Sequence, residues 1–397
     1  MSLSEKELVH IEQAKEAALH ILLRNAQGPF QGLPRTAGSG YPEPYTRDLM
    51  ISSLGFLATG SQKLADALER TLVALANNQT EHGHIASLAN DRDNRGSSDS
   101  TPLFLFGLAL YRRASNQPEF LKEEAEKALR WMQYQSPDDR VMVSQLPTSD
   151  WRDEQYVMGY GLYVNTIVYA YLRLYGEHES ARQLQGLITR LELSEGQSKG
   201  YEQEALVEPA AAYYALYSYK GMSSDRFDLL GNSLAILTGI ASPQWAGDLL
   251  TWVESECEAM QERGELAVHL PPCLLPYILP HHDDWLPRYE RYNRPGDYHN
   301  GGVWPFICGF YVAACVAAGK MDLAERKLLA LTNLVKPGHD SAAEWGFNEW
   351  IHAQTGQPCG CNWQTWSAAM YLYAAECVQT GSTPYFDEIR DYGVSGK

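Results

Sequence analysis

The sequence predicts an all-α protein, an (α/α)6 toroid with a double ring of about twelve helices. Almost every long segment repeats apolar residues at spacings of three and four, and alternation at a spacing of two is nearly absent. Some segments are apolar on nearly every side, whereas others carry one apolar stripe. A helix that is apolar all round is buried and a striped helix faces water, so the mixture indicates an inner ring within an outer ring. No exact repeat is visible, and an irregular helical array stays open as the alternative.

Helical periodicity marks the predicted elements in chain order. They are an N-terminal helix within 1–27 and the segments 47–59, 64–78, 101–115, 119–135, 162–176, 180–193, 208–221, 227–241, 243–263, 303–319, 323–336 and 362–379. The most apolar of them, 162–176, 303–319 and 362–379, are expected in the inner ring. The strongly amphipathic segments 119–135 and 323–336 are expected in the outer ring. No linker rich in Pro, Gly or Ser interrupts the series, so we expect residues 1–397 to form a single domain.

The charge balance argues against several classes of partner. The chain has 32 basic and 49 acidic residues and a formal net charge of −17. Such a surface repels phosphate backbones and anionic membranes, so we expect no nucleic-acid and no membrane partner. The apolar runs are shorter than the ~18–20 residues that cross a bilayer, and the N-terminus lacks the features of a signal peptide. We therefore expect a cytoplasmic protein, and a homo-oligomer stays open.

No cofactor or metal is expected. The seven cysteines are scattered without the spacing of a disulfide framework, which fits a reducing compartment. Cys359 and Cys361 are two thiols alone, which is weak evidence for a metal site. The run HHDD at 281–284 resembles a metal cluster, but adjacent side chains point in different directions, which favours a solvated loop. The chain also lacks the glycine-rich motifs that bind nucleotide phosphates.

Polar and aromatic residues cluster just before the apolar helices. The chain holds 24 Tyr and 10 Trp, a large stock of flat amphipathic surface. The clusters lie at 42–50, 94–102, 148–161, 296–305, 344–356 and 361–367. If each opens an inner helix, all six meet at one end of the toroid. Such a place suits a small polar ligand.

Two carboxylates stand beside aromatic residues in these clusters. Asp153 follows Trp151, and Glu349 lies between Phe347 and Trp350. A carboxyl packed against an aromatic wall is desolvated, which raises its pKa and suits a general acid. A second carboxylate across a bound sugar then serves as base or nucleophile. Local rivals for these roles are Asp150, Glu154 and Glu344.

Three further polar residues stand where helices are expected to begin. Arg47 and Asp48 form either a helix-start pair, with Asp48 serving the helix dipole, or a charged clamp on sugar hydroxyls. Asp99 in SSDSTP is most simply a helix N-cap.

Four ordered stretches resemble the plant and cyanobacterial neutral/alkaline invertases, glycoside hydrolases built as (α/α)6 barrels. The most specific is YHNGGVWPFICGFYVAACVAAGKMDLAERK at 298–327, which is similar to their Tyr-His-Asn-Gly-Gly-x-Trp-Pro segment. More modest likenesses are YTRDLMISSLGFLATG at 45–60, SSDSTPLFLFGLALYR at 97–112 and FNEWIHAQTG with NWQTWSAAMYL within 347–373.

The resemblance implies hydrolysis with inversion at the anomeric carbon. Asp153 would be the general acid and Glu349 the general base, with their carboxyl groups ~6.5–9.5 Å apart. The residues that would bind substrate are Tyr45, Arg47, Asp48, Asp99, Trp151, Tyr298, His299, Asn300, Trp304, Gln364 and Trp366, with Trp304 as a wall. The partner would be a small sugar, and no cofactor or metal is implied.

Two departures from the family leave alternatives open. DWRDEQYVM aligns with the family's Asp-Arg-Arg-Met only after a one-residue shift, so Asp150 competes with Asp153. After Glu349 the chain has WIHAQTG, and this region is equally similar to α-glucosidases, trehalases and debranching-type glucosidases of the same toroid.

The predicted function is that of an inverting, exo-acting glycoside hydrolase for a small oligosaccharide or glucoside, with sucrose or an α-glucoside as the leading substrate. The alternatives are an epimerase, an unsaturated-uronyl hydrolase and a non-catalytic carbohydrate-binding protein. An epimerase would use histidine pairs drawn from His281, His282, His299 and His352.

Overall fold

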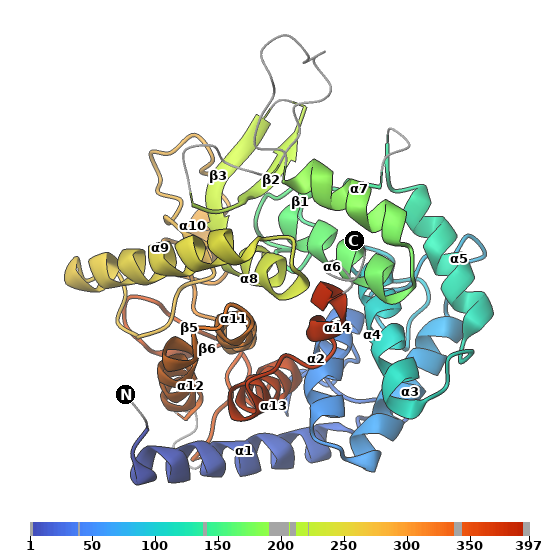
Figure 1. The fold of residues 1–397 in the computed structure, drawn as a ribbon, viewed down its shortest axis with the longest axis horizontal. Helices are drawn as coiled ribbons and strands as arrows, with labels where there is room; N and C mark the ends of the chain where they lie inside the picture. Colours follow the sequence, from blue (N-terminus) through green and yellow to red (C-terminus); the bar gives the residue numbers. More distant parts are fainter. Residues whose placement is uncertain are drawn as a thin grey trace.

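A computed structural model describes residues 3–38, 40–137, 141–189, 206, 212–220, 222–336 and 344–391. Within these ranges the chain is mostly helical, and its helices form two concentric rings (Figure 1). None of the described helices combines the length and apolarity needed to cross a bilayer.

Six helices form the inner ring. They are α2 (Thr46–Ala58), α4 (Ser100–Ser115), α6 (Leu162–Leu174), α8 (Leu229–Thr238), α11 (Pro305–Ala317) and α13 (Thr365–Thr380). Each packs against the next, and α13 packs against α2, so the ring is closed. In α11 every residue from Pro305 to Val316 is buried, as a helix without a polar face requires.

Six further helices lie outside this ring. They are α1 (Glu5–Asn25), α3 (Gln62–Asn77), α5 (Lys122–Gln133), α7 (His178–Ile188), α9 (Pro243–Glu262) and α12 (Met321–Val335). In α5 only Ala125, Ala128 and Met132 are buried, so one stripe faces the inner ring. The predicted double ring of helices is confirmed, whereas the assignment of all 397 residues to one domain stays a prediction.

Strands occur at the edge of the ring, where the sequence predicted none. β1 (Tyr160–Gly161), β2 (Ala215–Tyr219), β3 (Met222–Asp228) and β4 (Leu274–Leu275) form an antiparallel sheet in that order. β5 (Trp350–Ile351) and β6 (Pro358–Cys359) form a two-stranded ladder.

The helix predicted at 208–221 was therefore wrong in its described part. Residues 215–219 form β2. Residues 208–211 and 221 lie outside the described ranges, as do 190–193 of the predicted helix 180–193. A short run of Ala, Tyr, Leu and Ser fits both helical and strand periods, and pairing with β3 decides between them.

Helix α14 (Phe386–Asp391) closes one end of the inner ring by packing on α6 and α8 (Figure 1). Its Phe386 packs against Phe106 of α4. Phe386, Phe106, Tyr163 and Phe310 line an apolar cavity of about 20 Å³ at the ring axis. This volume is too small for a sugar.

Close contact between inner helices gives a first prediction. A Cβ at Gly55 of α2 would lie 2.1 Å from the carbonyl oxygen of Ala369 in α13, whereas a Cβ at Gly186 of α7 would meet nothing. We expect Gly55→Ala to lower the free energy of unfolding by about 1–3 kcal/mol through overpacking. Gly186→Ala should raise it by about 0.5–1 kcal/mol through helix propensity. Urea denaturation of both variants checks the opposite signs, and a neutral Gly55→Ala would contradict the tight contact.

Candidate active site

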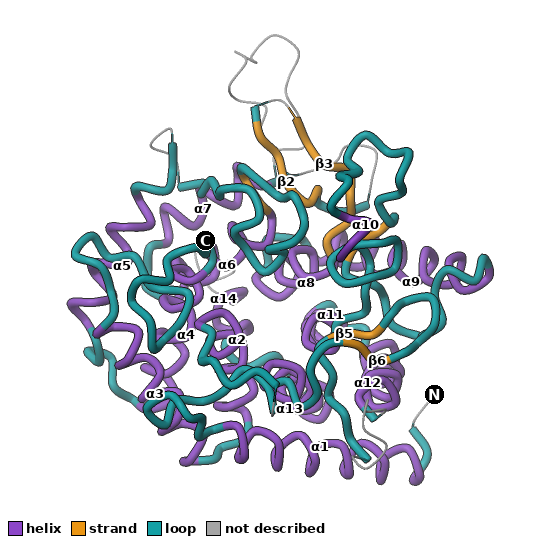
Figure 2. Tube along the Cα trace, turned by 180° about the vertical axis from the view of Figure 1, so that it is seen from behind, coloured by secondary structure: helices purple, strands orange, loops and turns teal. Residues whose placement is uncertain are grey.

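The candidate site lies at the end of the inner ring where the inner helices begin, away from α14 (Figure 2). The predicted clusters precede α2, α4, α6, α11 and α13 and do converge there, but the expectation of one cluster for each inner helix was wrong. Clusters 344–356 and 361–367 both precede α13, and none precedes α8. Helix α8 is preceded by β3 instead, and a strand leaves no polar-aromatic loop to recognise.

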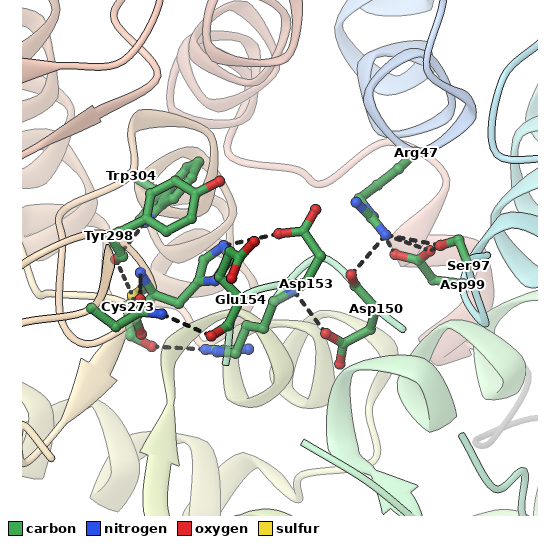
Figure 3. Close-up of polar contacts among 12 residues, drawn as sticks. Arg47, Ser97, Asp99, Asp150, Asp153, Glu154, Cys273, Tyr298 and Trp304 are labelled. Atoms are coloured by element: carbon green, nitrogen blue, oxygen red, sulfur yellow. Dashed lines mark hydrogen bonds and ion pairs between the residues drawn. The ribbon is translucent and has the colours of Figure 1, made fainter. Parts of the chain in front are cut away.

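Arg47 and Asp99 form a buried ion pair that joins α2 to α4. The guanidinium donates to both carboxylate oxygens, with Nε–Oδ2 at 2.6 Å and Nη2–Oδ1 at 3.1 Å. Nη2 also donates to Ser97 Oγ at 2.8 Å and to the carbonyl oxygen of Asp150 at 2.7 Å (Figure 3). Asp99 occupies the N-cap position of α4 but its side chain caps no N–H group. The predicted N-cap position is therefore confirmed, but the side chain does not cap the helix, because its carboxylate accepts hydrogen bonds from Arg47 and from the hydroxyl of Tyr163, at 3.1 Å.

The two rival aspartates of the acid loop have different surroundings. The Asp150 residue is 1% exposed, and its carboxylate accepts hydrogen bonds from Gln145 Nε2 at 2.9 Å and Arg152 N at 2.7 Å. The Asp153 side chain is 58% exposed and points toward the site (Figure 3). Partial loss of hydration raises the pKa of Asp153, and the nearby Arg47 opposes this. Asp150 thus holds the loop together, whereas the Asp153 carboxylate is open to a ligand.

Helix α8 contributes through Asp228 at its N-cap, which the sequence reading missed. Asp228 accepts hydrogen bonds from Leu230 N and from the fully buried Arg152, whose Nη2 lies 2.7 Å from Oδ1. The Arg152 guanidinium also stacks 4.2 Å from the ring centroid of Trp151. These contacts fix the residues on either side of Arg152, including Asp153.

An aromatic wall stands beside the acid loop. The ring of His299 stacks on Tyr298, at 4.0 Å, and on Trp304, at 5.7 Å between centroids, and the rings of Tyr298 and Trp304 are themselves 5.2 Å apart. Trp151 meets His299 and Trp304 edge-on. Trp151, His299 and Trp304 are almost fully buried, so they form the wall itself rather than an exposed platform.

His299 is a neutral group next to the candidate acid. Burial lowers its pKa well below the ordinary value, and the positive charges of Arg152 and Arg47 lower it further. Its Nε2 lies 3.9 Å from Oδ1 of Asp153. A neutral imidazole at this position offers a polar edge to a ligand without adding a charge to the site.

Tyr298 stands among the site's carboxylates. Its backbone is in the left-handed region, with φ of 42°, and its carbonyl oxygen accepts Trp304 Nε1 at 3.0 Å. Burial raises the pKa of its phenol, and the charges of Asp153, Glu349 and Glu154 raise it further. The hydroxyl therefore stays protonated and lies within the field of both candidate catalytic groups.

Asn300 does not face the site, contrary to its predicted substrate contact. Both of its N–H groups donate to the carbonyl oxygens of Ile278 and Asn293, and its Oδ1 accepts from Ile278 N. Its neighbour Asn293, which the sequence reading missed, links the loop of Glu154 to the loop of His299. Asn293 donates to the carbonyl oxygen of Glu154 at 2.9 Å and accepts from His299 N at 3.0 Å.

Glu349 lies across the site from the acid loop, just before β5. Its Oε2 accepts a hydrogen bond from Cys361 N at 3.1 Å. Burial raises the pKa of Glu349, and the charge of Asp153 raises it further. Hydrogen bonds from the Cys361 N–H and from the amide of Gln364 lower it. Gly360 has φ of 69°, and a Cβ there would lie 2.3 Å from Oε2 of Glu349. Gly360 therefore leaves the space that the carboxylate occupies.

Asp48 is the third carboxyl group on this side. It is 6% exposed, and burial raises its pKa to about 8, with Arg47 opposing and Glu349 adding to the shift. At neutral pH Asp48 is therefore largely protonated and can donate a hydrogen bond. Tyr45 at the N-cap of α2 is half-buried, and its ring lies 5.2 Å from that of Tyr41.

The remaining predicted residues divide between the site and its surroundings. Trp366 is buried and stacks on Phe306 at 4.0 Å between centroids, as part of the wall. Glu344 is exposed and lies 4.0 Å from Lys336, so it is a surface carboxylate. Glu154 pairs with Arg288 beside Asp153.

Comparison with known proteins supports the resemblance over part of the chain. The sequence profile of a family described as alkaline and neutral invertase matches residues 204–380. The probable alkaline/neutral invertase D of Arabidopsis thaliana is 31% identical over 150 residues, covering 38% of this chain and 26% of that protein. Cytosolic invertase 1 of Oryza sativa subsp. japonica is 29% identical over 152 residues, covering 38% and 25%. The chain spans about a quarter of the length of these relatives.

Solved structures share the fold. A GH63 mannosylglycerate hydrolase from Thermus thermophilus, in complex with Tris and D-glycerate, superposes with a TM-score of 0.64 at 16% identity, covering 90% of this chain and 99% of that one. A glycosidase in complex with glucose gives a TM-score of 0.65 at 13% identity, covering 95% and 99%.

The predicted resemblance to neutral/alkaline invertases is confirmed over 204–380, which includes the stretches 298–327 and 347–373. The stretches 45–60 and 97–112 precede the matched segment, as does Asp153, so their likeness to the family stays a prediction.

The space beside Glu349 gives a second prediction. If Glu349 is a catalytic group, Gly360→Ala should lower kcat at least about tenfold, because a Cβ there displaces the carboxylate and small misplacements of catalytic groups are costly. Gly356→Ala is the matched control: its φ is 68°, but its Cβ would meet only Val268 and Ala267, at 3.6 and 3.9 Å. Both variants carry the same backbone strain, so an equal loss in both would show that strain, not Glu349, is responsible.

The raised pKa of Asp48 gives a third prediction. Its pKa of about 8 in the folded protein exceeds the ordinary value of 3.8, so the folded protein binds more protons than the unfolded chain between about pH 4 and 8. Stability from this group therefore falls as pH rises through that window. Asp48→Asn should remove the fall, and its stability relative to wild type should increase by about 1 kcal/mol for each pH unit. Denaturation at pH 5, 6, 7 and 8 checks this, with Glu344→Gln as a surface control; a pH-independent difference would contradict the buried carboxyl.

Proposed function

We propose that the protein is an inverting, exo-acting glycoside hydrolase, with Asp153 as general acid and Glu349 as general base. The observation that carries the proposal is that Asp153 and Glu349 come from different loops but lie near the same phenol. Both have raised pKa values, and the charges of both raise the pKa of Tyr298. Two carboxyl groups facing a common point are the arrangement that glycosidic-bond hydrolysis uses.

The chemistry follows from the acid and base roles that the family resemblance implies. Asp153 enters protonated and gives its proton to the glycosidic oxygen as the bond to the anomeric carbon breaks. Glu349 enters ionised and takes a proton from a water whose oxygen bonds to the same carbon from the opposite face, which inverts the configuration. The expected separation of ~6.5–9.5 Å leaves room for that water.

Asp48 has a supporting role in this proposal. Two ionised carboxylates placed close together repel, so one of them holds a proton. The two carboxyl groups here are Asp48 and Glu349. Asp48 is the more buried of them and has a pKa of about 8. It takes the proton at neutral pH, which leaves Glu349 ionised for its role as base.

The Arg47–Asp99 pair, Gln364 and Tyr45 are proposed to bind the sugar around these groups. Arg47 is largely buried, and its Nε and Nη2 are already bonded, so its Nη1 is the donor proposed for a sugar hydroxyl. The half-buried Tyr45 presents an aromatic face, which suits the C–H face of a sugar. Trp151, Trp304 and Trp366 form the wall behind them.

The proposed substrate is a small glucoside, with sucrose tested first. The relatives that match by sequence are named invertases, and one protein of the same fold was solved with glucose. Because another protein of this fold is a mannosylglycerate hydrolase, trehalose, maltose, isomaltose and glucosylglycerate belong in the same assay. A cytoplasmic location stays a prediction, since relatives include cytosolic, mitochondrial and chloroplastic enzymes.

The acid and base roles give a fourth prediction. Asp153→Asn and Glu349→Gln should each lower kcat at least about a hundredfold on a natural disaccharide. They should differ on glucosyl fluoride, whose leaving group needs no proton: Asp153→Asn should keep most of its activity there, whereas Glu349→Gln should not.

Steady-state kinetics on both substrates check these roles, with Glu344→Gln as the surface control. If Asp150→Asn and not Asp153→Asn shows the selective rescue by fluoride, the assignment of the acid is wrong.

A further inference from the structure

The leaving-group half of the site is defined by the acid, and its location therefore rests on the proposed function. A general acid donates to the oxygen that departs with the leaving group, so that group lies on the acid's side of the bond. On the base side, Glu349 interacts with Asp48 and Tyr41 near the start of α2. The groups around Asp153 that belong neither to the base side, nor to α2, nor to the aromatic wall of Trp151, Tyr298, His299 and Trp304 are therefore the candidates to face the leaving group.

Those groups belong to the segment 288–293, which contains α10 (Tyr289–Tyr292) and is fixed to the acid loop. Arg288 Nη2 pairs with the carboxylate of Glu154, the residue next to Asp153. The hydroxyl of Tyr289 accepts a hydrogen bond from Tyr156 N at 2.9 Å. With the Asn293 bond to the Glu154 carbonyl oxygen, three contacts dock this segment directly beside the acid.

Glu154 and Arg288 remain accessible although they are paired. Their side chains are 35% and 47% exposed, so a ligand can reach both. Figure 3 shows Glu154 beside Asp153. The charge of Glu154 also raises the pKa of Asp153 and of Tyr298, which places its carboxylate within the field of the reacting groups.

We propose that Glu154 and Arg288 form the leaving-group subsite, and that Glu154 selects uncharged sugar or polyol leaving groups by occupying the Arg288 guanidinium. A guanidinium binds carboxylates and phosphates strongly when it is free. With Glu154 on it, an incoming anion meets a carboxylate of the same sign, whereas hydroxyl groups find both donors and acceptors. Exclusion by a like charge is an established route to specificity.

The test compares two glycosides that differ by one charge, glucosylglycerol and glucosylglycerate. Binding is measured by calorimetry in the Glu349→Gln background, so that hydrolysis does not consume either ligand. In the protein that keeps Glu154, we expect glucosylglycerol to bind more tightly than glucosylglycerate. Adding Glu154→Gln should shift the affinity ratio toward glucosylglycerate by about tenfold or more, because it frees the guanidinium and removes a nearby like charge.

The gain should depend on Arg288 and on charge. It should vanish when Arg288→Gln is added and shrink as salt is raised. Glu265→Gln is the matched control, since Glu265 forms an exposed pair with Arg263 elsewhere on the surface. Thermal melts of every variant verify folding.

An unchanged ratio in Glu154→Gln, tighter binding of glucosylglycerate before the change, or no binding of either glycoside would each overturn the subsite. Binding does not require turnover, so a protein that shows the expected switch but hydrolyses none of the sugars tested would refute the proposed function and leave only the charge selection at Glu154 and Arg288 standing.

Discussion

The buried pair of Arg47 and Asp99 is the interaction on which the rest of the site depends. A buried charge is stable only when it is paired and hydrogen-bonded, and here one guanidinium satisfies Asp99, Ser97 and the carbonyl oxygen of Asp150 together. These contacts join the first turns of α2 and α4 to the loop that carries Asp153. The same positive charge opposes the upward pKa shifts of Asp48 and Asp153 and helps to keep His299 neutral. One side chain thus positions the acid loop and sets the electrostatics around it.

The ring of helices explains why such a charged cluster can exist. The inner helices begin at one end, and their first turns offer N–H groups and the positive end of the helix dipole to the carboxylates gathered there. Helix α14 fills the opposite end with Phe386, which lines an apolar cavity there. The acidic groups then differ only in burial and partners: Asp150 is tied into its loop, Asp48 is buried and protonated, and Asp153 is open. Because their surroundings differ, these chemically similar side chains can have different roles in the site.

The sequence predicted the double ring because burial on all sides and burial on one side leave distinct patterns, as in 303–319 and 323–336. It also predicted Asp153 and Glu349 as candidates from their aromatic neighbours. It missed β2, because a run of Ala and Tyr has no decisive period, and it missed Asp228 and Asn293, because a lone Asp or Asn carries no signal of its partner. It misread Asn300, whose place in the motif YHNGG does not show that its amide is consumed by Ile278 and Asn293. Periodicity and motifs do not show which residues distant in the sequence become hydrogen-bond partners, and these misses depend on such partners.

The central claim, hydrolysis by two carboxylates on opposite faces of the sugar, is tested most directly by the configuration of the first product. Proton NMR of the purified protein with sucrose, trehalose, maltose, isomaltose and glucosylglycerate would record which anomer appears before mutarotation. The account predicts that a turned-over α-glucoside releases β-glucose first. Release of α-glucose would require a covalent intermediate on a carboxylate and would contradict the assignment of Glu349 as a base that activates water.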